Sequence, residues 1–333
     1  MKIAIFGSQE YDIESLNEAN KKYSYDLTFF KAYLNEKTAS LAKDFDAVCI
    51  FVQDTANKAV IDILAKEGVK TIALRCAGFN NVDLDSAKTN NISVVNVPAY
   101  SPHAVAEHAI GLILSLNRKI HHAYLRIRDG NFSLKGFLGF DLYGKTVGVV
   151  GTGKIGQETA KILKLGFGCK VIAADPYPNK SLEKEHKIEY VDLNVLLKNS
   201  DIISLHCPLT PQTKHMINKE SIAKMKKGVM LINTSRGTLI NTQEVIDALK
   251  SQQIGYLGLD VYEEETSLFY QDLSSSIITD DVFARLTTFP NVLITSHQGF
   301  FTKEALTTIS NTTFENIEKI SKNEKCENEL TKK

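Results

Sequence analysis

The run Val147-Gly-Val-Val-Gly-Thr-Gly-Lys-Ile-Gly156 predicts a β-strand that ends on a phosphate-binding turn. Its β-branched residues favour an extended strand, and Gly151, Gly153 and Gly156 have the spacing G-x-G-x-x-G ahead of a helical pattern. In such a turn the first glycine permits a tight bend, the second lets the backbone approach a pyrophosphate, and the third lets the helix pack closely on the strand. The helix N-terminus would then face the phosphates with free N–H groups.

A second predicted strand, residues 171–174, strengthens this interpretation. It ends at Asp175, about 20 residues beyond Gly156, where a carboxylate can bind the hydroxyls of an adenosine ribose. No arginine directly follows Asp175, so the sequence favours NAD over NADP. The alternative is an ordinary turn between a strand and a helix that binds nothing.

Short apolar strands alternate with helical patterns along the whole chain, which is typical of doubly wound parallel sheets in the α/β class. In the first hundred residues five such strands are expected, at 3–6, 27–30, 47–51, 71–74 and 93–96. Beyond them six strands are expected, the number in a full dinucleotide-binding fold, at 147–150, 171–174, 202–205, 229–233, 256–261 and 292–296. A single long helix capped by Ser101 should cover residues 102–130, and residues 303–320 should form the last helix before a frayed tail at 322–333.

The composition excludes several classes of protein. Lys+Arg and Asp+Glu are equal at 39 each, so no global field would attract nucleic acid or an anionic membrane. No apolar run approaches the roughly 18 residues of a membrane span. The five cysteines are scattered without a C-x-x-C pair, which indicates reduced thiols and a cytoplasmic protein, and no metal-ligand spacing occurs.

Three charged or titratable residues, Arg236, Glu265 and His297, follow the last three predicted strands. The carboxyl ends of parallel strands share one edge of a sheet, so these side chains can converge beside a bound cofactor. An arginine fork can bind a carboxylate, and a histidine can give or take a proton while a neighbouring carboxylate favours its charged form. From spacing alone each residue could equally be a solvated loop charge. His108, inside the predicted long helix, is interpreted as a core or interface histidine.

Several longer motifs resemble those of the D-isomer-specific 2-hydroxyacid dehydrogenases, and particularly of their lactate branch. They occur in the family's order over nearly the whole chain. The motifs are Val97–His108, Gly151–Gly156, His206–Thr213, Asn233–Gly237, Asp260–Glu265 and Pro290–His297, with Phe300-Phe-Thr302 after the last. The run 267–285 resembles the extended connection of the lactate branch.

The resemblance implies two doubly wound domains that close over a cleft. Residues 1–100 with 299–333 would form a flavodoxin-like substrate domain, and residues 101–298 a Rossmann NAD-binding domain that also builds a homodimer. The implied reaction is the reversible NADH-dependent reduction of a small 2-keto acid, with pyruvate and D-lactate as the expected pair. The alternatives are a D-2-hydroxyisocaproate or phenyllactate type of dehydrogenase, or a non-catalytic NADH-sensing module.

Site residues carry over from the family motifs one by one. His297 would be the acid/base, Arg236 would bind the substrate carboxylate and polarise the keto oxygen, and Glu265 would orient and tune His297. The expected substrate contacts are Phe51, Ala77, Gly78, Tyr100 and Phe300. The expected cofactor contacts are Gly151, Gly153, Lys154, Ile155, Gly156, Asp175, Cys207, Pro208, Thr213, Thr234, Ser235 and Asp260, the last at the nicotinamide carboxamide.

Overall fold

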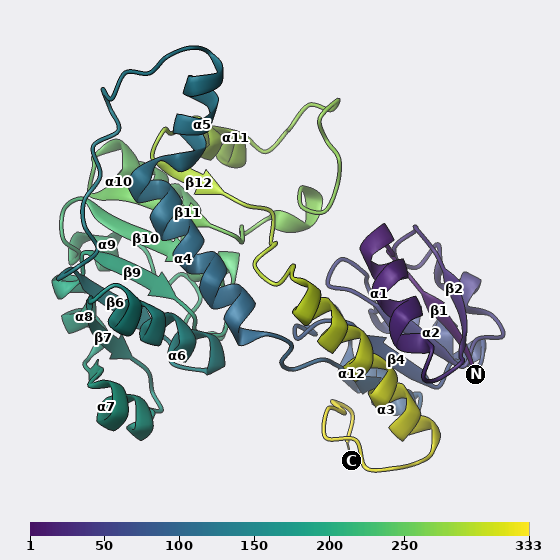
Figure 1. Cartoon of the computed structure of the whole chain (residues 1–333). Coiled ribbons are helices and arrows are strands. Elements are labelled where there is room, and N and C mark those ends of the chain that lie inside the picture. Colours follow the sequence, from purple (N-terminus) through teal and green to yellow (C-terminus); the bar gives the residue numbers. More distant parts are fainter. Residues whose placement is uncertain (333) are drawn as a thin grey trace. The chain divides into compact units, whose positions relative to one another are not determined.

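The computed structural model describes residues 1–332, which divide into two compact units (Figure 1). Unit 1 comprises Met1–Ser101 together with the chain from Phe301 onward, and unit 2 is Pro102–Phe300. Each unit contains one parallel sheet with a hydrophobic core on either face. Among the described residues, no helix combines the length and the apolar character that a membrane span requires.

Unit 1 has a five-stranded sheet in the order β2-β1-β3-β4-β5, the flavodoxin-like order. Its strands are β1 (Lys2–Ile5), β2 (Asp26–Phe29), β3 (Ala47–Ile50), β4 (Thr71–Leu74) and β5 (Ser93–Val95). Helices α2 (Lys58–Lys66) and α3 (Leu84–Thr89) cover one face, and α1 (Glu10–Asn20) and α12 (Lys303–Ser321) pack side by side on the other (Figure 1).

The strands of unit 1 are apolar at consecutive positions because both faces of the sheet are covered. In β3, Val48 and Ile50 enter the core under α2, whereas Ala47 and Cys49 enter the core under α1 and α12. All four residues are completely buried. The sheet is therefore a rigid platform, and the loops at its carboxyl edge are the parts free to carry function.

Unit 2 has a seven-stranded parallel sheet in the order β12-β11-β10-β9-β6-β7-β8. The strands are β6 (Thr146–Val150), β7 (Lys170–Ala174), β8 (Glu189–Tyr190), β9 (Ile202–Leu205), β10 (Val229–Asn233), β11 (Ile254–Leu259) and β12 (Val292–Ile294). Counted from β6, the first six have the order 3-2-1-4-5-6 of a dinucleotide-binding fold, and β12 adds a seventh strand beside β11. The predicted fold class, two doubly wound parallel-sheet domains, is confirmed.

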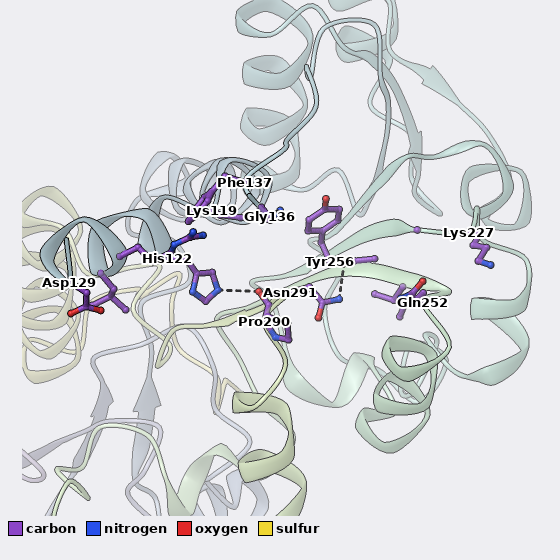
Figure 2. Close-up of a pocket in the computed structure, with 15 residues that line it drawn as sticks. Lys119, His122, Asp129, Gly136, Phe137, Lys227, Gln252, Tyr256, Pro290 and Asn291 are labelled. Atoms are coloured by element: carbon purple, nitrogen blue, oxygen red, sulfur yellow. Dashed lines mark hydrogen bonds between the residues drawn. The ribbon is translucent and has the colours of Figure 1, made fainter. Parts of the chain in front are cut away.

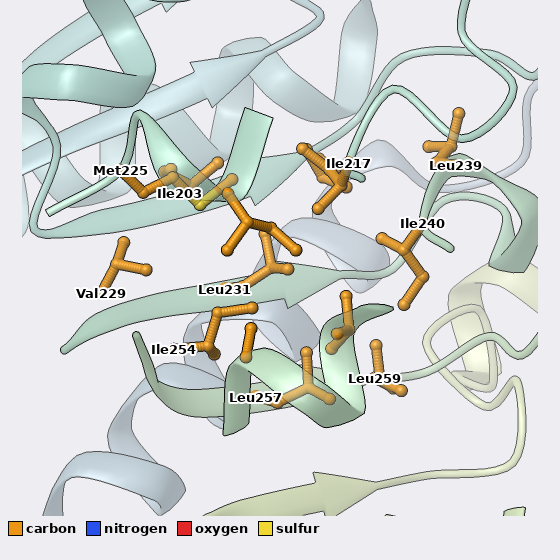
Figure 3. Close-up of a cluster of buried hydrophobic side chains, with 14 of the residues drawn as sticks. Ile203, Ile217, Met225, Val229, Leu231, Leu239, Ile240, Ile254, Leu257 and Leu259 are labelled. Atoms are coloured by element: carbon orange, nitrogen blue, oxygen red, sulfur yellow. The ribbon is translucent and has the colours of Figure 1, made fainter. Parts of the chain in front are cut away.

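Helices cover both faces of this sheet. Helices α4 (Pro102–Arg118) and α6 (Lys154–Lys161) lie on one face, and α6 continues as a π-helical turn over Ile162–Gly166. The other face carries α8 (Leu193–Asn199), α9 (Lys219–Ala223), α10 (Thr242–Lys250) and α11 (Asp281–Thr287). Figure 3 shows the core beneath them, where side chains of β9, β10 and β11 such as Ile203, Leu231 and Leu257 gather with Met225.

The expectation of one long helix over residues 102–130 is wrong. Helix α4 ends at Arg118, and α5 (Ile120–Arg128) begins after Lys119, whose backbone is left-handed with φ of 50°. The Asn117 side chain accepts from the N–H of Phe140 at 2.8 Å and donates to its carbonyl at 2.6 Å. The chain turns here because the segment after α5 folds back onto these side chains, a tertiary cause that apolar periodicity does not reveal.

Two further expectations need correction. The predicted six strands of unit 2 are seven, because the two-residue strand β8 and the preceding α7 (Lys180–His186) were missed. The tail is not frayed over residues 326–331: Leu330 N–H donates to the Val94 carbonyl at 2.8 Å, and Thr331 Oγ1 accepts from Val94 N–H at 3.0 Å. A lysine- and glutamate-rich composition is compatible with this order because the edge strand β5 offers unpaired backbone groups.

Candidate active site

Three neighbouring strands of unit 2 lead into the loops that carry the candidate site residues. Arg236 follows β10, Asp260 follows β11 directly, and His297 follows β12. These strands are consecutive in the sheet and parallel, so their carboxyl ends lie along one edge. This edge is where open α/β sheets bind ligands.

The loop that carries Arg236 is shaped by a fully buried asparagine. Asn233 Nδ2 donates to the Arg236 carbonyl at 2.8 Å, and its Oδ1 accepts from Ser235 N–H at 3.1 Å. The next residue, Gly237, packs so closely on the neighbouring strand-end loop that a Cβ there would lie 2.1 Å from the Tyr262 carbonyl carbon. The position of Arg236 is thus defined by its own turn and by the loop that leads to Glu265.

His297 is held from several sides. Its N–H donates to the Asp260 carbonyl at 2.7 Å, its carbonyl accepts from Tyr270 Oη at 3.1 Å, and its Nδ1 lies 2.9 Å from Glu265 Oε1. A carboxylate can only accept, so Nδ1 carries the hydrogen and Nε2 is the nitrogen that can exchange a proton. The backbone of His297 is left-handed, with φ of 51°, a strained conformation that is frequent at functional sites.

The Asp260 carboxylate caps the loop that contains His297. It is 2% exposed and accepts from Gln298 N–H at 2.9 Å, from Gly299 N–H at 2.8 Å and from Thr295 Oγ1 at 2.5 Å. Burial opposes ionisation, but hydrogen bonds from His108, Thr295 and Gly299 hold the pKa of Asp260 below its usual value. The carboxylate is therefore charged at neutral pH and fastens β11 to the loop after β12.

The glycine-rich turn leaves space at the start of α6. Gly151 has φ of +90°, and a Cβ there would lie 2.6 Å from the Cys207 backbone nitrogen, so the loops after β6 and β9 touch. A Cβ on Gly156 would lie 2.0 Å from the Gly151 carbonyl oxygen. Gly153 caps α6, and its Cβ would meet nothing within 4 Å. The first N–H groups of α6 therefore border open space. This space lies between β6 and β9, where the strand order of the sheet reverses.

Residues 110–299 match the model of the D-isomer specific 2-hydroxyacid dehydrogenase family, NAD binding domain. The chain belongs to this family. It is 55% identical over 330 residues to the D-lactate dehydrogenase of Escherichia coli (strain K12), covering 99% of this chain and 100% of that protein. The apo-structure of the E. coli enzyme superimposes with a TM-score of 0.92 at 53% identity, covering 99% of this chain and 100% of that one. The pyruvate reductase of Chlamydomonas reinhardtii gives 0.94 at 48% identity and 98% coverage of both chains.

The chain is accordingly an NAD-dependent D-2-hydroxyacid dehydrogenase. The residues around the glycine-rich turn fit the NAD cofactor. Beyond the open turn at Gly153, Thr234 Oγ1 is buried at the end of β10 without a hydrogen-bond partner in the described part of the chain. Ser235 Oγ donates to the Cys207 carbonyl at 2.7 Å, and Thr213 Oγ1 donates to the Pro208 carbonyl at 2.7 Å, so the loops after β9 and β10 are ordered. Burial raises the pKa of the Cys207 thiol to about 11, which keeps it neutral.

Asp175 lies at the end of β7, beside the glycine-rich turn. Its Oδ2 accepts from Thr152 N–H at 2.6 Å and from Thr152 Oγ1 at 3.0 Å, and its Oδ1 accepts from Tyr177 N–H at 2.8 Å. Tyr190, on the strand β8 that the sequence did not reveal, lies with its Oη 3.0 Å from Thr152 Oγ1. Each carboxylate oxygen has more than one lone pair, so Asp175 can still accept from ribose hydroxyls while the protein orients it.

A pair of alanine substitutions separates the cofactor role of the turn from its folding role. We expect Gly153→Ala to leave thermal unfolding unchanged, since its Cβ meets nothing, but to weaken NADH binding roughly tenfold by occupying the pyrophosphate's approach. Gly156→Ala should lower the unfolding temperature as well, because its Cβ collides with backbone. Calorimetry and NADH titration measure the two effects, and unchanged NADH affinity in Gly153→Ala would contradict the expectation.

The candidate substrate residues Phe51, Ala77, Gly78 and Tyr100 belong to unit 1. They follow β3, β4 and β5, which are neighbours in that sheet, so they lie along its carboxyl edge. The Ala77 carbonyl accepts from Asn96 Nδ2 at 2.8 Å, and the guanidinium of buried Arg75 lies 5.2 Å from the centre of the Phe51 ring. Phe300 is in unit 2 and 7% exposed.

Two residues that contact the loop over residues 295–299, called the His297 loop, were not assigned to the site from the sequence. Tyr270 lies in a connection without periodicity, and only the structure shows that its hydroxyl reaches the His297 carbonyl. His108 was interpreted as a core or interface residue, yet its Nε2 lies 3.3 Å from Asp260 Oδ1. Within residues 1–332, no three His, Cys, Asp or Glu side chains are grouped as a metal site would require.

Proposed function

We propose that the enzyme reduces pyruvate to D-lactate with NADH, reversibly. The observation that carries this proposal is the His297–Glu265 pair, with Nδ1 and Oε1 2.9 Å apart, on the same sheet edge as Arg236. The 55% identity to a D-lactate dehydrogenase supports pyruvate as the substrate. A regulatory NADH sensor would have no need of an oriented proton-transfer pair.

In the proposed mechanism, Arg236 binds the substrate carboxylate through its planar fork and polarises the keto oxygen. Bound NADH supplies the hydride that the keto carbon receives. His297 donates the Nε2 proton to the keto oxygen and recovers it from solvent, while Glu265 holds the ring through Nδ1. The reverse reaction uses His297 as the base. Phe51, Ala77, Gly78, Tyr100 and Phe300 are proposed as substrate contacts on the family motifs alone.

The substrate proposal is tested by following NADH oxidation at about 340 nm with pyruvate, 2-ketoisocaproate, phenylpyruvate and hydroxypyruvate, each with chiral analysis of the product. We expect pyruvate to have the highest kcat/KM and the product to be D-lactate. A higher kcat/KM for 2-ketoisocaproate or phenylpyruvate would favour the alternative D-2-hydroxyisocaproate or phenyllactate type, because methylene groups in an apolar pocket shift selectivity by about 10–200-fold. NADH binding without reduction of any keto acid would favour the sensor.

We also propose that the enzyme is a homodimer and that the α5 surface forms the contact. This surface consists of residues that are each more than half exposed: Ile120, Tyr124, Leu125, Ile127, Phe132, Leu134 and Leu138. Beside it lies a groove of about 730 Å³, where His122 Nε2 donates to the Pro290 carbonyl at 3.1 Å (Figure 2). Exposed large apolar side chains gathered along one helix and the segment after it are typical of a surface that a second copy covers.

Light scattering after size exclusion tests the dimer. We expect the wild type to elute with twice the chain mass of 37.0 kDa, and the double variant Leu125→Glu, Ile127→Glu to elute as a monomer, because buried charges oppose association. Ile277→Glu is the matched control: this residue is 90% exposed and lies outside the α5 surface. A monomeric wild type at micromolar concentration would contradict the proposal.

We also propose a cytoplasmic location, because the five cysteines are all free and buried.

A further inference from the structure

His108, on α4, reaches the hydrogen bonds that Asp260 accepts from the loop after β12. Its side chain is 19% exposed, and Nε2 lies 3.0 Å from Thr295 Oγ1 and 3.3 Å from Asp260 Oδ1. Thr295 is the first residue of the His297 loop. The imidazole therefore lies where a helix, the end of β11 and the His297 loop meet.

The direction of these hydrogen bonds follows from the donors that are present. Thr295 Oγ1 lies 2.5 Å from Asp260 Oδ1. Because a carboxylate only accepts, the threonine hydroxyl donates its single hydrogen to Asp260. His108 Nε2 must then be the donor to Thr295 Oγ1. His108, Thr295 and Asp260 form a directed chain that ends on a buried carboxylate, and such chains are stronger inside a protein than in water.

The carboxylate at the end of this chain fixes the backbone of His297. Asp260 accepts from the N–H groups of residues 298 and 299, and its carbonyl accepts from His297 N–H. Gly299 packs closely on both side chains: a Cβ at this position would lie 2.9 Å from Asp260 Oδ2 and 3.4 Å from His108 Cδ2. The left-handed conformation of His297 needs such external support, since an isolated residue would not keep it.

We propose that His108 is a positioning residue for His297, which it places by donating to Thr295 and Asp260. This inference rests on the proposed function, because it requires His297 to be the acid/base. His108 does not touch the substrate. Its effect on turnover comes through the placement of the His297 ring, and displacements of about 1 Å in such a group can cost on the order of 100-fold in rate.

The experiment compares His108→Leu, which fills the space without a donor, with His108→Gln, which can restore one. We expect His108→Leu to lower kcat with pyruvate about 10–100-fold, with a much smaller change in the KM for pyruvate, and His108→Gln to recover most of the loss. The primary isotope effect with deuterated NADH should rise in His108→Leu, because a misplaced acid slows the chemical step. His186→Leu, the same substitution on α7, is the control.

The outcomes separate this inference from the proposed function. If the wild type reduces no 2-keto acid, the proposed function fails. If the wild type is active and His297→Asn abolishes turnover while His108→Leu keeps kcat within about twofold, only the role of His108 is overturned. Equal losses in His108→Leu and His108→Gln would also overturn it. Should calorimetry show His108→Leu to be unfolded, Thr295→Val breaks the same chain, and normal kcat and isotope effect in that variant would refute the proposal.

Discussion

Replacing Arg236 by lysine should lower kcat/KM for pyruvate roughly 10–150-fold. Lysine keeps the charge but offers a point donor instead of a planar fork, so one of two parallel bonds to the substrate carboxylate is lost. A charge-assisted hydrogen bond is worth about 1.5–3 kcal/mol, which converts to that range of rates. The guanidinium gives the turn one hydrogen bond, from Nη1 to the Ser235 carbonyl at 2.7 Å. The turn should still persist, because Asn233 and the Gly237 packing also define it.

Steady-state kinetics and NADH titration together test this expectation. The affinity for NADH should stay within about threefold of wild type, since the loss concerns the substrate and its transition state. Arg285→Lys on α11 is the matched control, because its Nη1 contacts only a neighbouring threonine of the same helix end among the hydrogen bonds described. Near-normal kcat/KM in Arg236→Lys would remove Arg236 from the proposed role.

Much of the fold could be predicted because its signals are local. Strands such as β3 and β6 are continuous apolar runs, and the glycine turn marks the start of α6 through backbone requirements that hold in any context. The break at Lys119 could not be predicted, because it depends on side chains that bind a segment about 20 residues later in the chain. The order of the C-terminal tail could not be predicted for the same reason, because the tail pairs with β5, which is far away in the sequence.

The candidate site likewise contains residues that the sequence indicates and residues that only the structure shows. Arg236 and His297 could be proposed from the sequence because ligand-binding residues of parallel sheets follow strand ends, a rule that needs only the strand positions. The supports of His297 were not found, because Tyr270 and His108 come from a loop and a helix whose placement is set by tertiary packing. The sequence therefore indicates candidate chemical groups more readily than the residues that position them, since positioning residues act through geometry alone.

Replacing His297 by asparagine should lower kcat about 100- to 10,000-fold, the usual contribution of a positioned acid or base. Asparagine is the appropriate substitution for two reasons. After glycine, it is among the residues that best tolerate a left-handed backbone, so the φ of 51° is retained. Its amide can still donate toward Glu265, yet it cannot exchange a proton, so the variant removes the chemistry while keeping the loop.

Binding and turnover must be measured separately for that variant. The fluorescence of NADH itself reports binding, and we expect its Kd to stay within about threefold of wild type. Loss of kcat with intact binding assigns the proton step to His297. If His297→Asn kept more than about a tenth of wild-type kcat, the proton would have to come from another group, and the oriented pair with Glu265 would be a structural support.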